Sequence, residues 1–120
     1  MGRLDGKRMV ITGSSRSLGR EFALACAAQG ASVVINGTNE DALASVAGEI
    51  EKAGGKVLSV AGSVADSAVC TELVRTCVDG FGGIDVMVNN AGIVRDRTLL
   101  KMSDEDFDEV IAVDLRGPFL

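Results

Sequence analysis

The sequence has no histidine, no tryptophan and no tyrosine among its 120 residues. Without histidine, neither a Ser-His-Asp triad nor a Cys-His pair can form, and a zinc site is not expected. The cysteines are three, an odd number, and they lie in helical patterns without a C-x-x-C spacing. We therefore expect no metal site, and we expect reduced, buried thiols at Cys26, Cys70 and Cys77.

Aromatic residues and positive charge are also scarce. All four aromatic residues are phenylalanine, so a chain that is 47% hydrophobic must build its core from Val, Ile, Leu and Ala. Such residues are typical of a parallel sheet covered by helices on both faces. The net charge of −5 argues against nucleic acid as a partner. No apolar run has the length of a membrane span or a signal peptide, so we expect no membrane partner and a cytoplasmic protein.

A turn of small residues between a strand and a helix is the most informative stretch. Residues 7–12 end in an apolar run, and the turn that follows contains Gly13 and Gly19. Such a turn leaves the first amides of the helix without partners, and these amides can bind a phosphate. An ordinary strand–helix turn remains the alternative, because the pattern differs from the common G-x-G-x-x-G fingerprint. The residues expected on the buried face of this helix are Leu18, Phe22, Ala25 and Cys26.

Strands and helices alternate along the rest of the chain. Apolar runs predict strands at residues 32–35, 56–61 and 84–88, and capping signals predict further helices. The first of these helices begins at Thr38-Asn39 and is expected to bury Leu43, Val46, Ala47 and Ile50. The second begins at Asp66 and is expected to bury Cys70, Leu73, Val74 and Cys77. The third begins at Ser103, and its apolar residues are Phe107, Val110 and Ile111. The alternation predicts an α/β fold, a Rossmann-type doubly wound parallel sheet of about four strands, in a single, incomplete domain over residues 1–120.

Small or polar clusters follow each of the predicted strands. They lie at residues 13–19, 36–38, 62–64 and 89–92. In open sheets of this kind, ligands bind beyond the carboxyl ends of the strands. We therefore expect the clusters to meet at one rim and to form a cofactor site.

Two motifs together resemble the short-chain dehydrogenase/reductase family: Thr12-Gly13-x-x-x-Ser17-x-Gly19 and Asn89-Asn90-Ala91-Gly92. Two further stretches are similar in sequence to the 3-oxoacyl-carrier-protein reductases. They are Gly92-Ile93-Val94-Arg95-Asp96-Arg97 and Val113-Asp114-Leu115-Arg116-Gly117. The resemblance implies an NAD(P)-dependent oxidoreductase that transfers a hydride between the nicotinamide and a small-molecule ketone or alcohol. It also implies that the full-length protein is a homo-oligomer.

The resemblance implies a role for each cluster at the rim. The pyrophosphate would lie against Gly13, Ser14, Ser15, Leu18 and Gly19, and the adenine would be flanked by Ser63 and Val64. The ribose and the nicotinamide would lie along Asn90, Ala91 and Gly92. Asn89 would help to hold the central strand. Two positions depart from the family pattern. Ser17 stands at the family's middle glycine, and Ser63 stands where an aspartate is usual. Both departures are expected to weaken cofactor binding without excluding it.

Charge at the rim favours NADP over NAD. An NAD site needs an acid at the end of the second strand, and this chain has Asn36-Gly37-Thr38 there. Arg16 lies inside the glycine turn, where the resemblance places an arginine that contacts a 2′-phosphate. We therefore predict NADP as the cofactor, with NAD as the alternative and with Arg16 and Thr38 in the site.

The family's proton-transferring tyrosine, with its lysine and serine partners, has no counterpart here. We therefore expect the chain to be the N-terminal half of a longer reductase, inactive by itself, with a Tyr-x-x-x-Lys further along. Asp114 stands at the family's catalytic asparagine position, on the apolar side of the last helix, and a solvent-facing aspartate is its alternative. A non-catalytic dinucleotide-binding module that acts through a partner remains open. A methyltransferase-like enzyme is disfavoured by the missing acid on the second strand.

Overall fold

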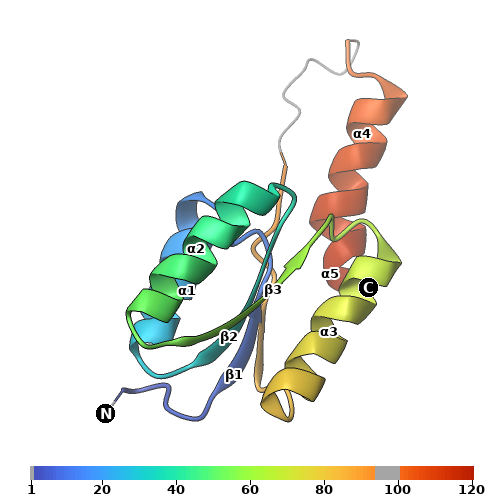
Figure 1. Ribbon diagram of the computed structural model, residues 1–120. Coiled ribbons are helices and arrows are strands. Elements are labelled where there is room, and N and C mark those ends of the chain that lie inside the picture. Colours follow the sequence, from blue (N-terminus) through green and yellow to red (C-terminus); the bar gives the residue numbers. More distant parts are fainter. Residues whose placement is uncertain (1, 94–100) are drawn as a thin grey trace.

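The computed structural model describes residues 2–93 and 101–120. The strands β1 (Arg8–Ile11), β2 (Ser32–Gly37), β3 (Lys56–Ala61) and β4 (Val86–Val88) form one parallel sheet in the order β3-β2-β1-β4 (Figure 1). The helices are α1 (Ser17–Ala28), α2 (Glu40–Lys52), α3 (Ser67–Phe81) and α4 (Asp104–Val110), followed by the π-helix η1 (Ile111–Arg116) and the short α5 (Gly117–Phe119). The expected Rossmann-type parallel sheet is confirmed.

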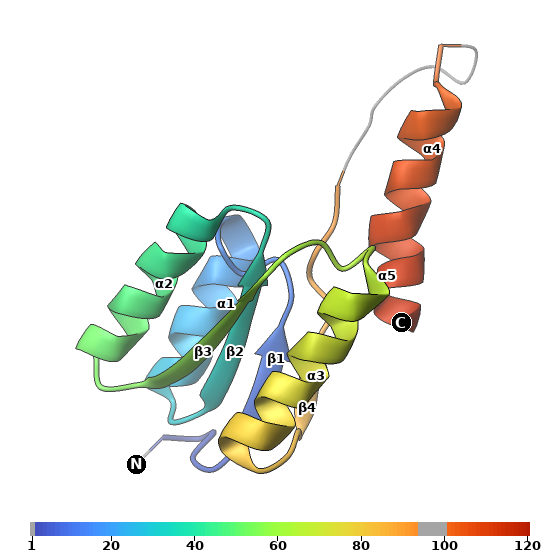
Figure 2. The same ribbon diagram turned by 45° about the vertical axis from the view of Figure 1, so that its right-hand side comes forward.

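The strand order reverses beside β1, and this places helices on both faces of the sheet. Figure 2 shows α1 and α2 on one side and α3 on the other. Side chains alternate between the faces, so Ile11 and Ile35 pack toward α1 and α2 while Val10 and Val34 pack toward α3. The β-branched residues predicted for the core are therefore buried in the two central strands, β1 and β2.

The helices α2 and α3 bury most of the side chains that periodicity predicts. Leu43, Val46 and Ile50 of α2 are buried, as are Leu73 and Cys77 of α3. The exceptions are Val74, which is exposed, and Ala47 and Cys70, which are half-buried. Burial raises the pKa of the thiols of Cys26, Cys70 and Cys77, and all three cysteines are free.

The predicted buried face of α1 is wrong. Leu18 is 60% exposed and Phe22 is 39% exposed, whereas Gly19 and Ala23 face the sheet. A Cβ at Gly19 would overlap the carbonyl oxygen of Gly13, so the helix lies too close to the turn for large side chains. Ala25 is also exposed, and Cys26 is half-buried. A pattern read from side-chain size selects the bulky residues and misses a face built from the smallest ones.

The predicted apolar face of α4 is also left uncovered. Phe107 and Ile111 are exposed, and Val110 is half-buried. Asp114 lies on η1 and is exposed, which agrees with the solvent-facing alternative and not with a position on a buried face. None of the described helices combines the length and hydrophobicity needed to cross a membrane.

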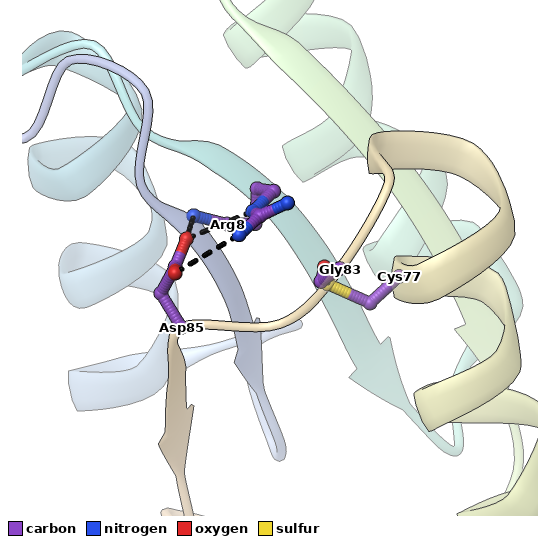
Figure 3. A network of polar contacts seen from close by, with 4 residues as sticks. All are labelled: Arg8, Cys77, Gly83 and Asp85. Carbon is purple, nitrogen blue, oxygen red and sulfur yellow. Dashed lines mark hydrogen bonds and ion pairs between the residues drawn. The ribbon is translucent and has the colours of Figure 1, made fainter.

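An ion pair fixes β4 beside β1 at the amino end of the sheet (Figure 3). The Arg8 amide and Nε each donate to Asp85 Oδ2 at 2.9 Å, and Nη2 donates to Oδ1 at 3.1 Å. The Asp85 amide donates in return to the Arg8 carbonyl at 2.8 Å, and nearby the Cys77 thiol donates to the Gly83 carbonyl at 3.2 Å. The hydrogen bonds from Arg8 lower the pKa of Asp85 to about 2. This contact sets the register in which Val86 pairs with Met9.

Candidate functional site

A groove of about 700 Å³ lies where the four strands end. The segments that line it follow β1, β2, β3 and β4, and α4 and η1 add one side. The lining residues are Gly13, Ser15, Arg16, Ser17, Leu18, Asn36, Gly37, Thr38, Gly62, Ser63, Val64, Asn90, Ala91, Gly92, Ile93, Glu109 and Val113. The clusters expected to meet at one rim do lie together. Of the predicted cofactor residues, Ser14 and Gly19 lie behind this lining.

The turn before α1 offers a run of unpaired backbone amides. The Gly13 amide donates to Asn36 Oδ1 at 3.2 Å, and the Ser14 amide donates to the Asn36 carbonyl at 2.7 Å. In the described part of the chain, the amides of residues 15–19 have no acceptor. No side chain caps this end of α1 either. The available donors therefore begin at Ser15, and Ser14 is used inside the protein.

Two glycines allow the turn to pack against the loop after β4. Gly13 has a φ of +62°, and a Cβ there would lie 2.7 Å from the Ala91 Cα. At Gly19, a Cβ would lie 2.5 Å from Asn90 Nδ2 and would overlap the Gly13 carbonyl oxygen. Ser17 also has a positive φ, of +51°, although it carries a Cβ. Ser17 is therefore strained at a position where the family pattern has glycine.

Thr12 joins the end of β1 to the loop after β4. Its Oγ1 accepts hydrogen bonds from the amides of Asn90 and Ala91, each at 3.0 Å, and donates to the Val88 carbonyl at 3.4 Å. Asn90 Nδ2 donates to the Gly13 carbonyl at 3.1 Å. Asn89 is exposed and forms no hydrogen bond with the described residues, so its expected role in holding the central strand is not seen. Sequence reasoning named Thr12 as the first residue of the glycine-turn motif but missed this role, whose signal is a hydroxyl directly after a buried apolar run.

Asn36 joins three of the segments around the groove. It is 1% exposed, and its Nδ2 donates to the carbonyls of Val60 and Gly62 at 3.1 and 3.0 Å. Its backbone amide donates to Ser14 Oγ at 2.9 Å, and its Oδ1 accepts from Gly13. Sequence reasoning placed Asn36 in a cluster at the rim and used it as evidence that an acid is missing, but predicted no structural role for its side chain. The overlooked signal is an amide side chain at the end of a strand that is otherwise buried and apolar.

The groove has a cation at one end of its rim. Arg16 is exposed, and its guanidinium forms no ion pair with any described residue. Thr38 is exposed at the end of β2, and no carboxylate lines the groove there. Beyond β3, Ser63 Oγ accepts from the Ala65 amide at 3.1 Å, and Val64 is buried against Gly117.

Asp114 supports the groove from η1 and does not line it. Its Oδ1 accepts from the Ile93 amide at 2.8 Å. From the same helix, Arg116 Nη1 donates to the Ala65 carbonyl at 3.0 Å. The π-helix therefore contacts both the loop after β4 and the loop after β3. The described residues contain no cluster of side chains that could hold a metal ion.

Known proteins match this chain over nearly all of its length. The chain is 46% identical over 122 residues to the hydroxyacyl-CoA dehydrogenase ChsB1 of Mycobacterium tuberculosis, covering 98% of this chain and 38% of that protein. It is 42% identical to a 3-oxoacyl-[acyl-carrier-protein] reductase of Synechocystis sp., covering 100% of this chain and 49% of that protein. A short chain dehydrogenase from Burkholderia cenocepacia J2315, solved in complex with NADP, superposes with a TM-score of 0.93 at 34% identity, covering 98% and 49% of the two chains.

The chain thus spans half or less of the length of these relatives. The stretch 94–97, which carries part of the resemblance to the 3-oxoacyl-carrier-protein reductases, lies outside the described residues. The family model for short chain dehydrogenases matches residues 7–120, which include the glycine turn and the loop after β4. The chain belongs to the short-chain dehydrogenase family.

Proposed function

We propose that the groove binds NADP and that this chain is the cofactor-binding part of an oxidoreductase acting on a 3-oxoacyl or similar ketone. Members of the family are oxidoreductases that use NAD or NADP. The run of unpaired amides at residues 15–19 carries the proposal, because it gives an anion several donors at the amino end of α1. The groove volume of about 700 Å³ also lies within the usual range of ligand sites.

The diphosphate would lie over the turn before α1. Donors from residues 15–19 and the positive end of the helix dipole favour a negative charge there. Because Gly13 has no side chain, the turn packs directly against Ala91 in the loop after β4, and the backbone of both segments lies at the groove. Ser17 adds a hydroxyl to the lining, and this can donate one further hydrogen bond.

Arg16 would distinguish NADP from NAD. The two cofactors differ by a phosphate on the adenine ribose, and guanidinium pairs with phosphate through two parallel hydrogen bonds. Arg16 and Thr38 line the same groove, and the end of β2 lacks the acid that an NAD site uses for the ribose hydroxyls. This arrangement favours the phosphorylated dinucleotide.

The chemistry of the reaction divides between the cofactor and protein groups. The nicotinamide supplies or accepts the hydride when bound, and Asn90, Ala91 and Gly92 would orient it at the β4 side of the groove. The relatives named for hydroxyacyl-CoA and 3-oxoacyl-carrier-protein support a 3-oxoacyl or 3-hydroxyacyl substrate. These 120 residues contain neither tyrosine nor histidine. We therefore propose that the proton-transferring group comes from outside them, from further chain or from a partner.

Calorimetric titration with NADPH and NADH tests this assignment. Replacing Arg16 with alanine is expected to raise the Kd for NADPH roughly 10- to 100-fold, because one charge-assisted pair is lost. The Kd for NADH should change by less than about twofold. Arg75→Ala is the matched control, since it removes the same charge from an exposed position of α3 outside the groove lining.

Three outcomes would refute parts of the proposal. If the unaltered chain binds neither dinucleotide, the cofactor assignment fails. If Arg16→Ala and Arg75→Ala weaken NADPH binding equally, the effect is one of net charge and Arg16 is not in the site. If the 120 residues turn over a ketone with NADPH, the proton-transferring group lies among them.

A further inference from the structure

Asn36 lines the groove, and its carboxamide forms three hydrogen bonds to backbone groups. Its carboxamide oxygen accepts from Gly13, and its carboxamide nitrogen donates to Val60 and Gly62, at distances from 3.0 to 3.2 Å. Its backbone amide and carbonyl are both paired with Ser14. Asn36 therefore links the glycine turn after β1 to the segment after β3, across the end of β2.

We propose that Asn36 is a positioning residue for the dinucleotide, an inference that rests on the proposed function. Its Oδ1 holds the Gly13 amide inside the protein, and this fixes the start of the turn. Its Nδ2 holds the Gly62 carbonyl at the β3 side of the same groove. The diphosphate region and the adenine region are thereby kept at a set separation by one buried amide group.

The carboxamide is matched to its three partners. Oδ1 of Asn36 accepts from the Gly13 N–H, and the two N–H groups of Nδ2 donate to the carbonyls of Val60 and Gly62. Both donors and the acceptor of the carboxamide therefore have a backbone partner. Aspartate has nearly the same shape but carries no donor when ionised, so its charge would face the carbonyls of Val60 and Gly62. Leucine has a similar volume and would remove the side-chain partner of all three backbone groups in a buried place.

Aspartate at this position provides a reversible test. A buried carboxyl that faces two carbonyls has a raised pKa, because burial disfavours its charged form. Once protonated, it can donate to one carbonyl and still accept from Gly13, which restores most of the network. The other ionisable side chains that line the groove are Arg16 and Glu109, and both are present in every variant compared.

The experiment measures binding of NADP by the full chain from pH 8 to pH 5. In Asn36→Asp, the Kd is expected to be raised roughly tenfold or more at pH 8 and to recover severalfold toward pH 5. The unaltered chain and the control Asn39→Asp should show the same, weaker pH dependence. Asn39 is an exposed helix cap, and an aspartate there can still accept from the Ala42 amide.

A second readout needs no cofactor. Hydrogen exchange of the Gly13 amide, followed by NMR, should accelerate in Asn36→Leu relative to the amides of the core strands. If exchange at Gly13 is unchanged, the proposed link is wrong even if the unaltered chain binds no dinucleotide. If the chain binds NADP and Asn36→Asp follows the unaltered pH profile, the positioning role is wrong. If Asn36→Asp is unfolded at every pH, Asn36 serves the whole fold and the proposal is overturned.

Discussion

Replacing Ser17 with glycine should stabilise the protein, which is unusual for a substitution at the first residue of a helix. Ser17 has a φ of +51°, a conformation in which a Cβ crowds the following carbonyl at a cost of about 1–2 kcal/mol. Glycine removes that cost but adds about 0.4–1 kcal/mol of backbone freedom to the unfolded chain. The net gain is therefore about 0.5–1 kcal/mol, or roughly 2–4 °C in Tm.

Urea denaturation followed by circular dichroism measures this difference directly. Ser17→Ala is the matched control, because it removes the same hydroxyl but keeps the Cβ that causes the strain. Both variants lack the hydroxyl, so the stability of the glycine variant should exceed that of the alanine variant by the same net amount, about 0.5–1 kcal/mol. Equal stabilities for the two variants would show that the left-handed conformation at Ser17 costs no more than the backbone freedom that glycine adds to the unfolded chain, and would refute the predicted gain.

Three further predictions concern stability elsewhere in the fold. The Arg8–Asp85 contact lowers the pKa of Asp85 from 3.8 to about 2. The ion pair therefore stabilises the folded state above pH 4, and this stabilisation is lost as the pH falls toward 2. The difference in urea midpoint between the unaltered chain and Asp85→Asn should shrink over that range. Asp114→Asn should keep protection of the Ile93 amide from hydrogen exchange, because an amide oxygen can also accept, whereas Asp114→Ala should lose it. Leu73→Ala should cost about 2–5 kcal/mol in urea unfolding, because Leu73 is buried between α3 and the sheet.

Each of these predictions has a result that would contradict it. A constant difference between the unaltered chain and Asp85→Asn from pH 5 to pH 2 would mean that the carboxylate is not stabilised in the folded state. Equal protection at Ile93 in both Asp114 variants would mean that the side-chain hydrogen bond does not form. The exposed Val78 provides the control for Leu73, since Val78→Ala leaves no buried cavity and should cost far less.

The features that depend on neighbouring residues could be predicted from the sequence. The expected strand at residues 56–61 coincides with β3, because a largely apolar run stands between the pair Gly54-Gly55 and the turn that begins at Gly62. Asp66 and Ser103 accept from amides in the first turns of α3 and α4, as their spacing predicts. At the third predicted cap, the acceptor is Asn39, which bonds to the Ala42 amide.

The features that depend on distant contacts could not be predicted in the same way. Thr12 and Asn36 contribute the hydrogen bonds that assemble the groove, yet their partners lie from 22 to 79 residues away. Periodicity misjudged α1 because the helix approaches the turn through Gly19, where only a missing side chain fits. It also gave no sign of the π-helical turns that bring Asp114 to Ile93.

The chain crosses from β3 at one edge of the sheet to β4 at the other edge, and this order has a consequence for folding during synthesis on the ribosome. Pairing of β1, β2 and β3 needs no residue beyond Ala61, whereas Thr12 acquires its last partner only when Ala91 emerges. At roughly 5–20 residues per second, translation separates these two events by about 2–6 s. During this interval the open edge of β1 is available for wrong pairing. Slow codons between residues 61 and 91 would lengthen that exposure and lower the yield of correctly folded chains.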